Sequence, residues 1–207
     1  MAPSHSGWNA DLMRVILASQ SPRRRELLTL VGIDHEVQPA DIDETPWPDE
    51  APIPHTERLA ISKARVIAER VPDALVIAAD TIVVIDGALL GKPLDDADAR
   101  AMLRRLSGRT HEVCTAMAIA HGSRVESDVV RVSVRFRDLD DDTIARYVET
   151  REPMDKAGAY GIQGYGATIV EHIEGDYFAV MGLSLVTVMR LAARMGLSYR
   201  FGPLVRA

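Results

Sequence analysis

The chain has 207 residues, of which 47% are hydrophobic and 26% are charged, and its formal net charge at pH 7 is −6. This length suits one large domain or two lobes that share a cleft. The acidic balance disfavours binding to nucleic acid or to an anionic membrane, both of which need a positively charged protein surface, although a local cluster of basic residues can still hold an anionic substrate.

The cysteine content and the N-terminus indicate a reducing compartment. Cys114 is the single cysteine, so no intrachain disulfide can form, and its apolar surroundings favour a buried core thiol. Residues 1–12 lack the apolar core of a secretory signal, and no run of about 20 apolar residues is present to span a membrane. We expect a soluble, cytoplasmic protein with a flexible extension over residues 1–12 and a single domain over residues 13–207.

The first predicted elements are a strand, a tight loop and a helix. Residues 14–18 form a short apolar run, which indicates a buried strand. Ser21 is a good helix N-cap and Pro22 suits the first helical position, so a helix is predicted from Pro22 to about residue 31, before Gly32.

The remaining pattern alternates strands, helices and two conspicuous loops. Strands are predicted over residues 33–38, 74–79, 82–85, 110–120, 124–137 and 167–173. Helices are predicted over residues 56–70, 96–106, 141–149 and 183–195. Loops are predicted over the proline-rich residues 39–55 and the glycine-rich residues 155–166. We therefore expect an α/β fold with a long mixed sheet flanked by helices.

The helix that begins after Ser21 is a candidate anion site. The N-terminal N–H groups of a helix carry partial positive charge, and arginine offers a fork of donors that matches phosphate oxygens. Arg23 and Arg24 lie in this first turn, where they oppose the helix dipole unless an anion binds. A solvated basic turn is the alternative.

Asp80 lies between two apolar runs, so its carboxylate needs a partner, which can be a metal, a lysine or hydrogen-bond donors. A carboxylate in this position is a candidate for activating water or for binding a divalent ion near phosphate. A simple turn aspartate between two strands is the alternative. Lys63 and Lys92 are candidate cations for the same phosphates, each weak by itself.

The two loops supply further candidates. Asp41, Asp43 and Glu44 can add metal-binding oxygens, although a solvated acidic loop is the more common explanation. The glycines of residues 155–166 favour a close approach of the backbone to a ligand, and Gln163 carries both a donor and an acceptor for a base edge. A glycine-rich turn without a ligand is the alternative. His111, at the start of a predicted strand, is interpreted as a structural residue rather than a catalytic base.

Five segments together resemble the Maf family of nucleotide pyrophosphatases, and they occur in the family's order over roughly residues 13–195. These segments are Leu17–Arg24, Ala79–Val83, Gly91–Pro93, Leu106–His111 and Asp155–Gly164. The resemblance implies a Maf/ITPase-like α/β fold with two lobes around a central nucleotide-binding cleft, a homodimer, and dependence on a divalent cation such as Mg²⁺ or Mn²⁺.

The resemblance also implies residue roles. Asp80 matches the general base, and Glu44, Lys63 and Lys92 match other charged residues of the catalytic cleft. Asp80 and Glu44 are the implied metal ligands. The implied reaction is hydrolysis of a nucleoside triphosphate between its α- and β-phosphates.

Substrate binding is implied for Ser21, Arg23, Arg24, Thr81 and Gln163. The combination of Arg23, Thr81 and Gln163 is similar to the subgroup that acts on dTTP, UTP and modified pyrimidine nucleotides. Residues 179–184 depart from the family, because the usual Asn and Pro are absent. A non-catalytic regulator of septum formation and a general phosphatase that releases orthophosphate remain alternative functions.

Overall fold

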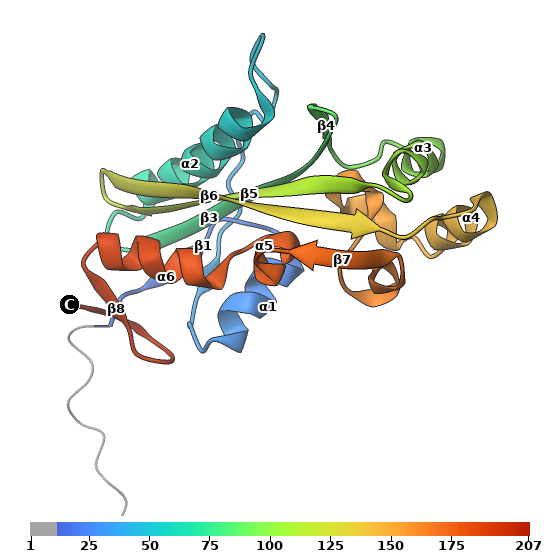
Figure 1. The fold of residues 1–207 in the computed structure, drawn as a ribbon. Helices are drawn as coiled ribbons and strands as arrows, with labels where there is room; N and C mark the ends of the chain where they lie inside the picture. Colours follow the sequence, from blue (N-terminus) through green and yellow to red (C-terminus); the bar gives the residue numbers. More distant parts are fainter. Residues whose placement is uncertain (1–11) are drawn as a thin grey trace, which may run out of the picture.

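A computed structural model describes residues 12–207 (Figure 1). The expected extension over residues 1–12 therefore lies, apart from Leu12, outside the described residues. Within the described part of the chain, no helix is long and apolar enough to cross a membrane.

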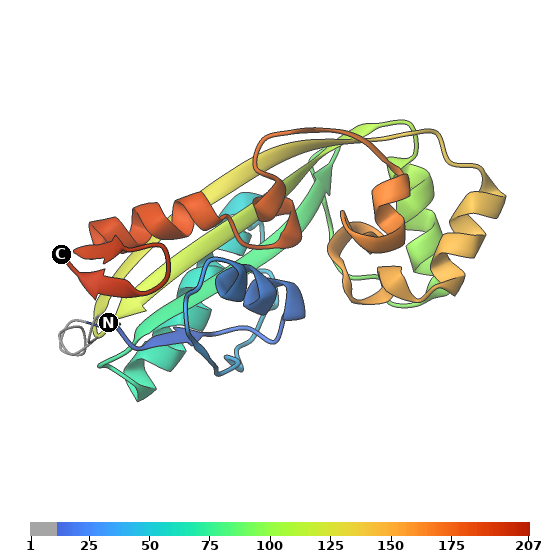
Figure 2. The same cartoon turned by 90° about the horizontal axis from the view of Figure 1, so that it is seen from below.

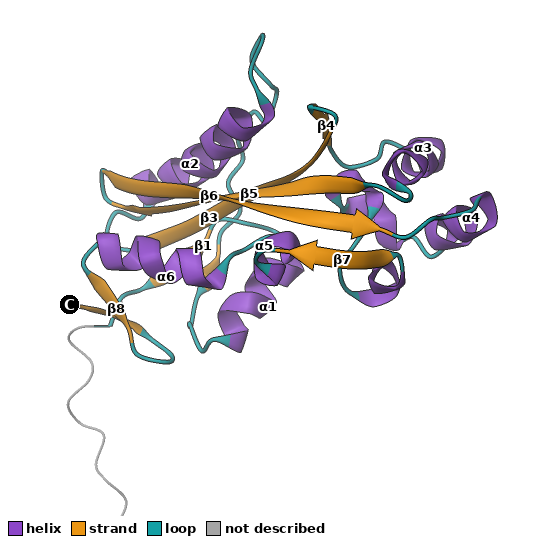
Figure 3. Cartoon of the chain, viewed as in Figure 1, coloured by secondary structure: helices purple, strands orange, loops and turns teal. Residues whose placement is uncertain are grey.

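A seven-stranded mixed sheet runs the length of the molecule (Figure 3). Its strands, in chain order, are β1 (Val15–Leu17), β2 (Glu36–Val37), β3 (Leu75–Ile85), β4 (Ala88–Leu90), β5 (Thr110–His121), β6 (Arg124–Phe136) and β7 (Val170–Glu174). The strand order is β2-β1-β3-β5-β6-β7, with β4 paired to β3. Strand β1 pairs in parallel with β2 and β3, and the other pairings are antiparallel. The predicted mixed α/β fold is confirmed.

The prediction of two strands separated at Asp80 and Thr81 is wrong. Strand β3 is continuous, and Asp80 pairs with Ala116 and Thr81 with Thr115 of β5. Two polar side chains within an apolar run looked like a turn, but both find hydrogen-bond partners from other segments, which removes the cost of burying them in a strand.

Helices and short turns cover the sheet. They are α1 (Pro22–Leu30), α2 (Pro52–Arg70), α3 (Asp96–Leu106), α4 (Asp141–Glu149), α5 (Tyr177–Met181), α6 (Leu185–Arg194) and the 3₁₀ turns η1 (Glu152–Asp155), η2 (Ala157–Ala159) and η3 (Gly164–Thr168). The chain ends in a hairpin of β8 (Leu197–Tyr199) and β9 (Leu204–Arg206). The sequence did not predict α5 or this hairpin.

Several boundaries differ from the predictions. Strand β2 spans only Glu36–Val37, and α6 begins at Leu185 rather than at residue 183. Helix α2 begins at Pro52 rather than at Thr56, because a proline in the first helical turn loses no intrahelical hydrogen bond. The glycine-rich segment is a series of 3₁₀ turns, and β7 begins at Val170 rather than at residue 167.

The described residues form an elongated molecule with two lobes (Figure 2). In one lobe α2 packs on one face of β3 and β5, and α6 covers the opposite face (Figure 1). Small residues such as Ala60, Ala64 and Ala118 let α2 approach the sheet closely. The other lobe contains α3, α4 and η2 around a second core that includes Phe136. Strands β3, β5 and β6 contribute to the cores of both lobes.

Candidate active site

A cleft of about 530 Å³ opens beside the middle of β3, where α1, α2 and the segment of η1 and η2 converge. Protein pockets for small molecules commonly occupy about 300–1,000 Å³, so a nucleotide fits this volume. Asp41 lines this cleft, whereas Asp43, the other candidate aspartate of the proline-rich loop, does not. Nine further predicted site residues line it. They are Ser21, Arg23, Arg24, Glu44, Lys63, Asp80, Thr81, Lys92 and Gln163.

The N-terminus of α1 forms one wall of the cleft. Ser21 caps the helix by accepting a hydrogen bond from the Arg24 backbone N–H at 3.5 Å, and its own N–H donates to Ser19 Oγ at 3.2 Å. The first-turn N–H groups therefore lie at the cleft, where they favour an anion. The Arg23 guanidinium lies 3.7 Å from Asp155 and remains partly exposed.

Arg24 joins several segments at the cleft floor. Its guanidinium donates to the carbonyl oxygens of Gly182 and Ala79, both at 2.8 Å, and to Ser19 Oγ at 3.1 Å and Thr81 Oγ1 at 3.2 Å. Burial lowers the pKa of Arg24 from its ordinary value, and the negative charge of Asp80 opposes this effect. Four of the five guanidinium N–H groups are engaged, so one is left for a ligand.

The segment that departs from the Maf pattern forms part of this arrangement. Helix α5 ends at Gly182, whose φ of 112° lies in the left-handed region that favours glycine. A Cβ at this position would lie 3.2 Å from Arg24 Nε. Although the usual Asn and Pro are absent here, the turn at Gly182 still forms, and its carbonyl oxygen accepts a hydrogen bond from Arg24.

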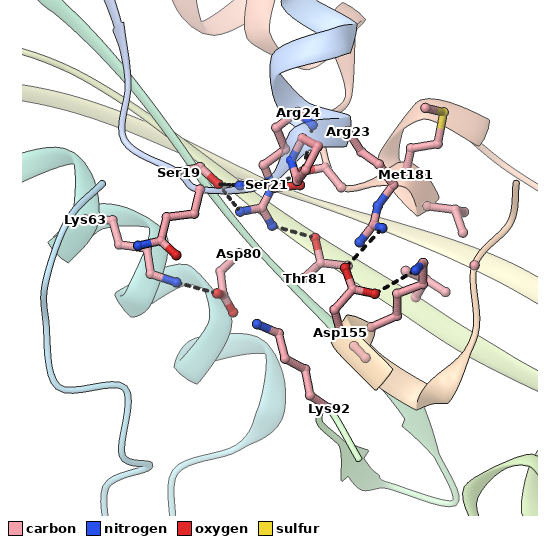
Figure 4. A pocket seen from close by; sticks show the side chains of 18 of the residues that line it. Ser19, Ser21, Arg23, Arg24, Lys63, Asp80, Thr81, Lys92, Asp155 and Met181 are labelled. Carbon is pink, nitrogen blue, oxygen red and sulfur yellow. Dashed lines mark hydrogen bonds and ion pairs between the residues drawn. The ribbon is translucent and has the colours of Figure 1, made fainter. Parts of the chain in front are cut away.

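Asp80 and Lys63 lie across the cleft from α1 (Figure 4), and Glu44 completes a charged cluster with them. Lys63 Nζ lies 2.8 Å from Asp80 Oδ1 and 2.7 Å from Glu44 Oε1. The Asp80 and Lys63 side chains are 14% and 11% exposed, whereas the Glu44 side chain is 59% exposed. Partial burial raises the pKa of Glu44, but the hydrogen bond and charge of Lys63, with smaller contributions from Lys92 and Arg24, outweigh it and lower the pKa. Asp80 is therefore a lysine-paired strand residue rather than a turn aspartate.

The same two carboxylates fit a divalent metal ion. Carboxylate oxygens are the ligands that Mg²⁺ and Mn²⁺ prefer, and Asp80 and Glu44 both lie within hydrogen-bond distance of one ammonium group. Between residues 12 and 207, no group of three or more His, Cys, Asp or Glu side chains is arranged to hold a metal. Two protein ligands suit Mg²⁺, which usually completes its shell with water and substrate phosphate oxygens.

Sequence reasoning did not identify two charged residues of the cleft, Asp155 and Lys156, which lie in the segment of η1 and η2. Lys156 Nζ donates to Asp155 Oδ1 and to the Glu152 carbonyl oxygen, both at 2.6 Å. Partial burial raises the pKa of Asp155, but Lys156 and Arg23 outweigh it and lower the pKa. Their position at the start of the glycine-rich segment was the signal that could have found them. Lys92 extends from below toward Asp80 (Figure 4).

The two predicted base-selecting residues have different surroundings. Thr115 Oγ1 donates to the Ala179 carbonyl at 2.8 Å, so the 3.0 Å contact between the two threonine hydroxyls is donated by Thr81. Thr81 in turn accepts from Arg24. Gln163, in contrast, is exposed at the cleft. Thr81 therefore supports Arg24, and Gln163 can approach a ligand directly.

Cys114 and His111 are core residues, as the sequence indicated. Cys114 is buried, and burial raises the pKa of its thiol. His111 is 3% exposed, lies 2.8 Å from the Tyr160 hydroxyl, and packs edge-on against Phe136. Burial lowers the pKa of His111 to about 4.

The buried His111 makes stability depend on pH. Below pH 6.5 the unfolded chain binds a proton on this imidazole that the folded protein does not bind until about pH 4. Stability is therefore lost as the pH falls through this window, by about 3 kcal/mol from this one group. We expect His111→Phe to flatten this part of the curve of unfolding free energy against pH, measured by urea denaturation. His172→Phe, at an exposed position, is the control, and an equal slope in both variants would contradict the assignment.

These features define an α/β protein whose cleft is suited to a phosphate-bearing ligand and to the activation of water beside it. The chain belongs to the Maf family, because the model of that family, described as Maf-like protein, matches residues 14–195.

Several relatives carry the name dTTP/UTP pyrophosphatase. The protein of Aromatoleum aromaticum is 47% identical over 197 residues, which cover 88% of this chain and 96% of the relative. The proteins of Moorella thermoacetica and Myxococcus xanthus are each 50% identical, and the matches cover 89% and 91% of this chain and 96% of each relative. Among solved structures, the Ham1 protein of Staphylococcus aureus aligns with a TM-score of 0.48 at 16% identity, over 77% of this chain and 80% of that chain, a weaker similarity.

Proposed function

We propose that this protein hydrolyses dTTP, UTP and modified pyrimidine nucleoside triphosphates to the monophosphate and pyrophosphate. The observation that carries the proposal is the arrangement of the cleft, in which the Asp80–Lys63–Glu44 cluster lies opposite the N-terminus of α1. One side offers carboxylates for water and metal, and the other offers donors for phosphate. The names of the relatives support the same substrates.

The triphosphate binds between the two walls. The Arg23 backbone N–H in the first turn of α1, the partly exposed Arg23 guanidinium and the remaining guanidinium N–H of Arg24 bind phosphate oxygens. Lys92 and Lys156 offset the charge that grows on the pyrophosphate as it leaves. Such pre-placed cations contribute most of the stabilisation in phosphoryl transfer.

Asp80 orients a water molecule toward the α-phosphorus and accepts its proton. The water oxygen forms the new bond to this phosphorus, the bond to the bridging oxygen breaks, and the electron pair leaves with pyrophosphate. Lys63 holds the Asp80 carboxylate in place. A divalent cation, Mg²⁺ or Mn²⁺, would be held by Asp80 and Glu44, and when bound it neutralises phosphate charge.

Base selection is assigned to Gln163 and Thr81. The exposed Gln163 amide can donate to and accept from a pyrimidine edge. Thr81 acts through the position of Arg24, with which it shares a hydrogen bond. We also propose a cytoplasmic location, which the single unpaired Cys114 supports, and a homodimer, which rests on the family resemblance. The net charge of −6 supports the absence of nucleic-acid and membrane partners.

Product analysis tests the proposed function. Purified protein is incubated with Mg²⁺ or Mn²⁺ and a panel of canonical and modified nucleoside triphosphates, and monophosphate, pyrophosphate and orthophosphate are quantified. We expect pyrophosphate and monophosphate in equal amounts, with dTTP and UTP as preferred canonical substrates. Orthophosphate as the first product would identify a general phosphatase. Nucleotide binding without turnover by the folded protein would leave a regulatory role in septum formation.

A further inference from the structure

The carboxylate of Glu152, outside the cleft, organises the glycine-rich segment. Its Oε1 accepts hydrogen bonds from the Tyr147 hydroxyl at 2.8 Å and from the Gly166 N–H at 2.9 Å. Its Oε2 accepts from the Tyr165 N–H at 2.9 Å. A Cβ at Gly164 would overlap this oxygen, so the backbone closes directly around the carboxylate. The two oxygens together hold the C-terminal end of residues 161–166.

Tyr147 of α4 holds the other end of the same segment. Its hydroxyl accepts from the Gly161 N–H at 3.1 Å while it donates to Glu152. The Tyr147 side chain is buried, and burial raises its pKa, so the hydroxyl keeps the proton that it donates. A Cβ at Gly166 would overlap both the Tyr147 hydroxyl and the Gly161 carbonyl oxygen. Residues 161 and 166 are thus held together by one phenol and one carboxylate.

Gln163 lies within the segment that this pair closes. Gly161, Ile162 and Gln163 line the cleft, whereas Glu152 and Tyr147 do not. The Glu152 carboxylate and the Tyr147 hydroxyl therefore act on a bound nucleotide through the position of the intervening backbone.

We propose that Glu152 and Tyr147 are positioning residues for base recognition, because they fix residues 161–166 so that the Gln163 amide faces the pyrimidine. This inference rests on the proposed role of Gln163 and extends it to residues that do not contact substrate. The pair affects binding of the base, and the phosphate-binding residues of α1, Arg23 and Arg24, have no hydrogen bond to either side chain.

Two conservative variants isolate the pair. Glu152→Gln keeps the shape of the side chain but replaces one acceptor oxygen with an NH₂ group. This donor then faces another donor, either a backbone N–H or the Tyr147 hydroxyl, and a hydrogen bond is lost. Tyr147→Phe removes only the hydroxyl that accepts from Gly161. Glu149→Gln, at an exposed position of α4, and Tyr165→Phe, at an exposed ring of the same segment, are the matched controls.

The measurement is the Kd of α,β-imido analogues of UTP and GTP by calorimetry, together with Tm. We expect each variant to reduce the preference for the UTP analogue by roughly tenfold, the scale of one lost buried hydrogen bond. Because both residues act on one segment, the double variant should lose no more than the stronger single variant. Gln163→Ala should show a loss of similar size, and both controls should keep the wild-type ratio.

Because the Kd measurement requires no turnover, it tests the positioning role separately from the proposed reaction. A changed Kd ratio in a protein without turnover would support the positioning role and refute the pyrophosphatase reaction. A lower Tm with an unchanged Kd ratio would overturn the inference, since Glu152 and Tyr147 would then serve stability alone. Wild-type protein that does not distinguish the two analogues would also overturn it.

Discussion

Asp80→Asn is expected to lower kcat by about 10²–10⁴-fold, the usual contribution of a positioned general base. The asparagine oxygen can still accept from Lys63 Nζ, which lies 2.8 Å from the carboxylate, so the local structure should survive. The amide cannot take the proton of the attacking water. The rate of pyrophosphate release at saturating dTTP or UTP checks this expectation.

The matched control is Asp142→Asn, at an aspartate that pairs with Arg146 on the exposed surface of α4. It should keep the wild-type rate, because an exposed ion pair of this kind contributes little. An Asp80→Asn protein that folds normally and keeps full turnover would remove Asp80 from the role of general base.

Arg24→Met is expected to destabilise the protein by about 3–5 kcal/mol, because several partly buried acceptors lose their hydrogen-bond donor together. The substitution leaves four acceptors on three parts of the chain without their donor, including the carbonyl oxygens of Ala79 and Gly182. The free energy of unfolding from urea denaturation measures the effect. Arg24→Lys should recover only part of it, because an ammonium group has three donors and no planar fork.

Arg25→Met is the control for this prediction. Arg25 is the next residue of the same helical turn, but its side chain is exposed, and methionine and arginine have similar helix propensities. We expect a change within about 0.5 kcal/mol. Equal unfolding free energies for the two variants would show that the Arg24 network does not stabilise the fold.

Local signals in the sequence predicted much of this fold. Ser21 followed by Pro22 placed the start of α1 correctly, because capping depends on neighbouring residues alone. The clean alternation in residues 130–137 likewise predicted part of the antiparallel pair of β5 and β6.

The failures occurred where distant partners decide the structure. The sequence around Asp80 is compatible with a turn, because the residue that pairs with it, Lys63, lies on α2. Sequence reasoning assigned Arg24 only a phosphate-binding role, and its contact with Gly182, which links residues 158 positions apart, is in no local pattern. Asp155 and Lys156 were not predicted as site residues, because only the fold brings Arg23 next to Asp155.

The continuity of β3 through Asp80 has a mechanical consequence. In many two-lobed proteins a ligand is enclosed when the lobes swing about a flexible connection. Here strands β3 and β5 cross the junction of the lobes as paired strands, and Asp80 and Thr81 belong to that pairing. Swinging the lobes would break backbone hydrogen bonds at Asp80, the proposed general base. The Asp80 carboxylate is thus held on a pair of continuous strands, and adjustment to different nucleotides falls to a loop at the rim of the cleft, such as residues 39–51.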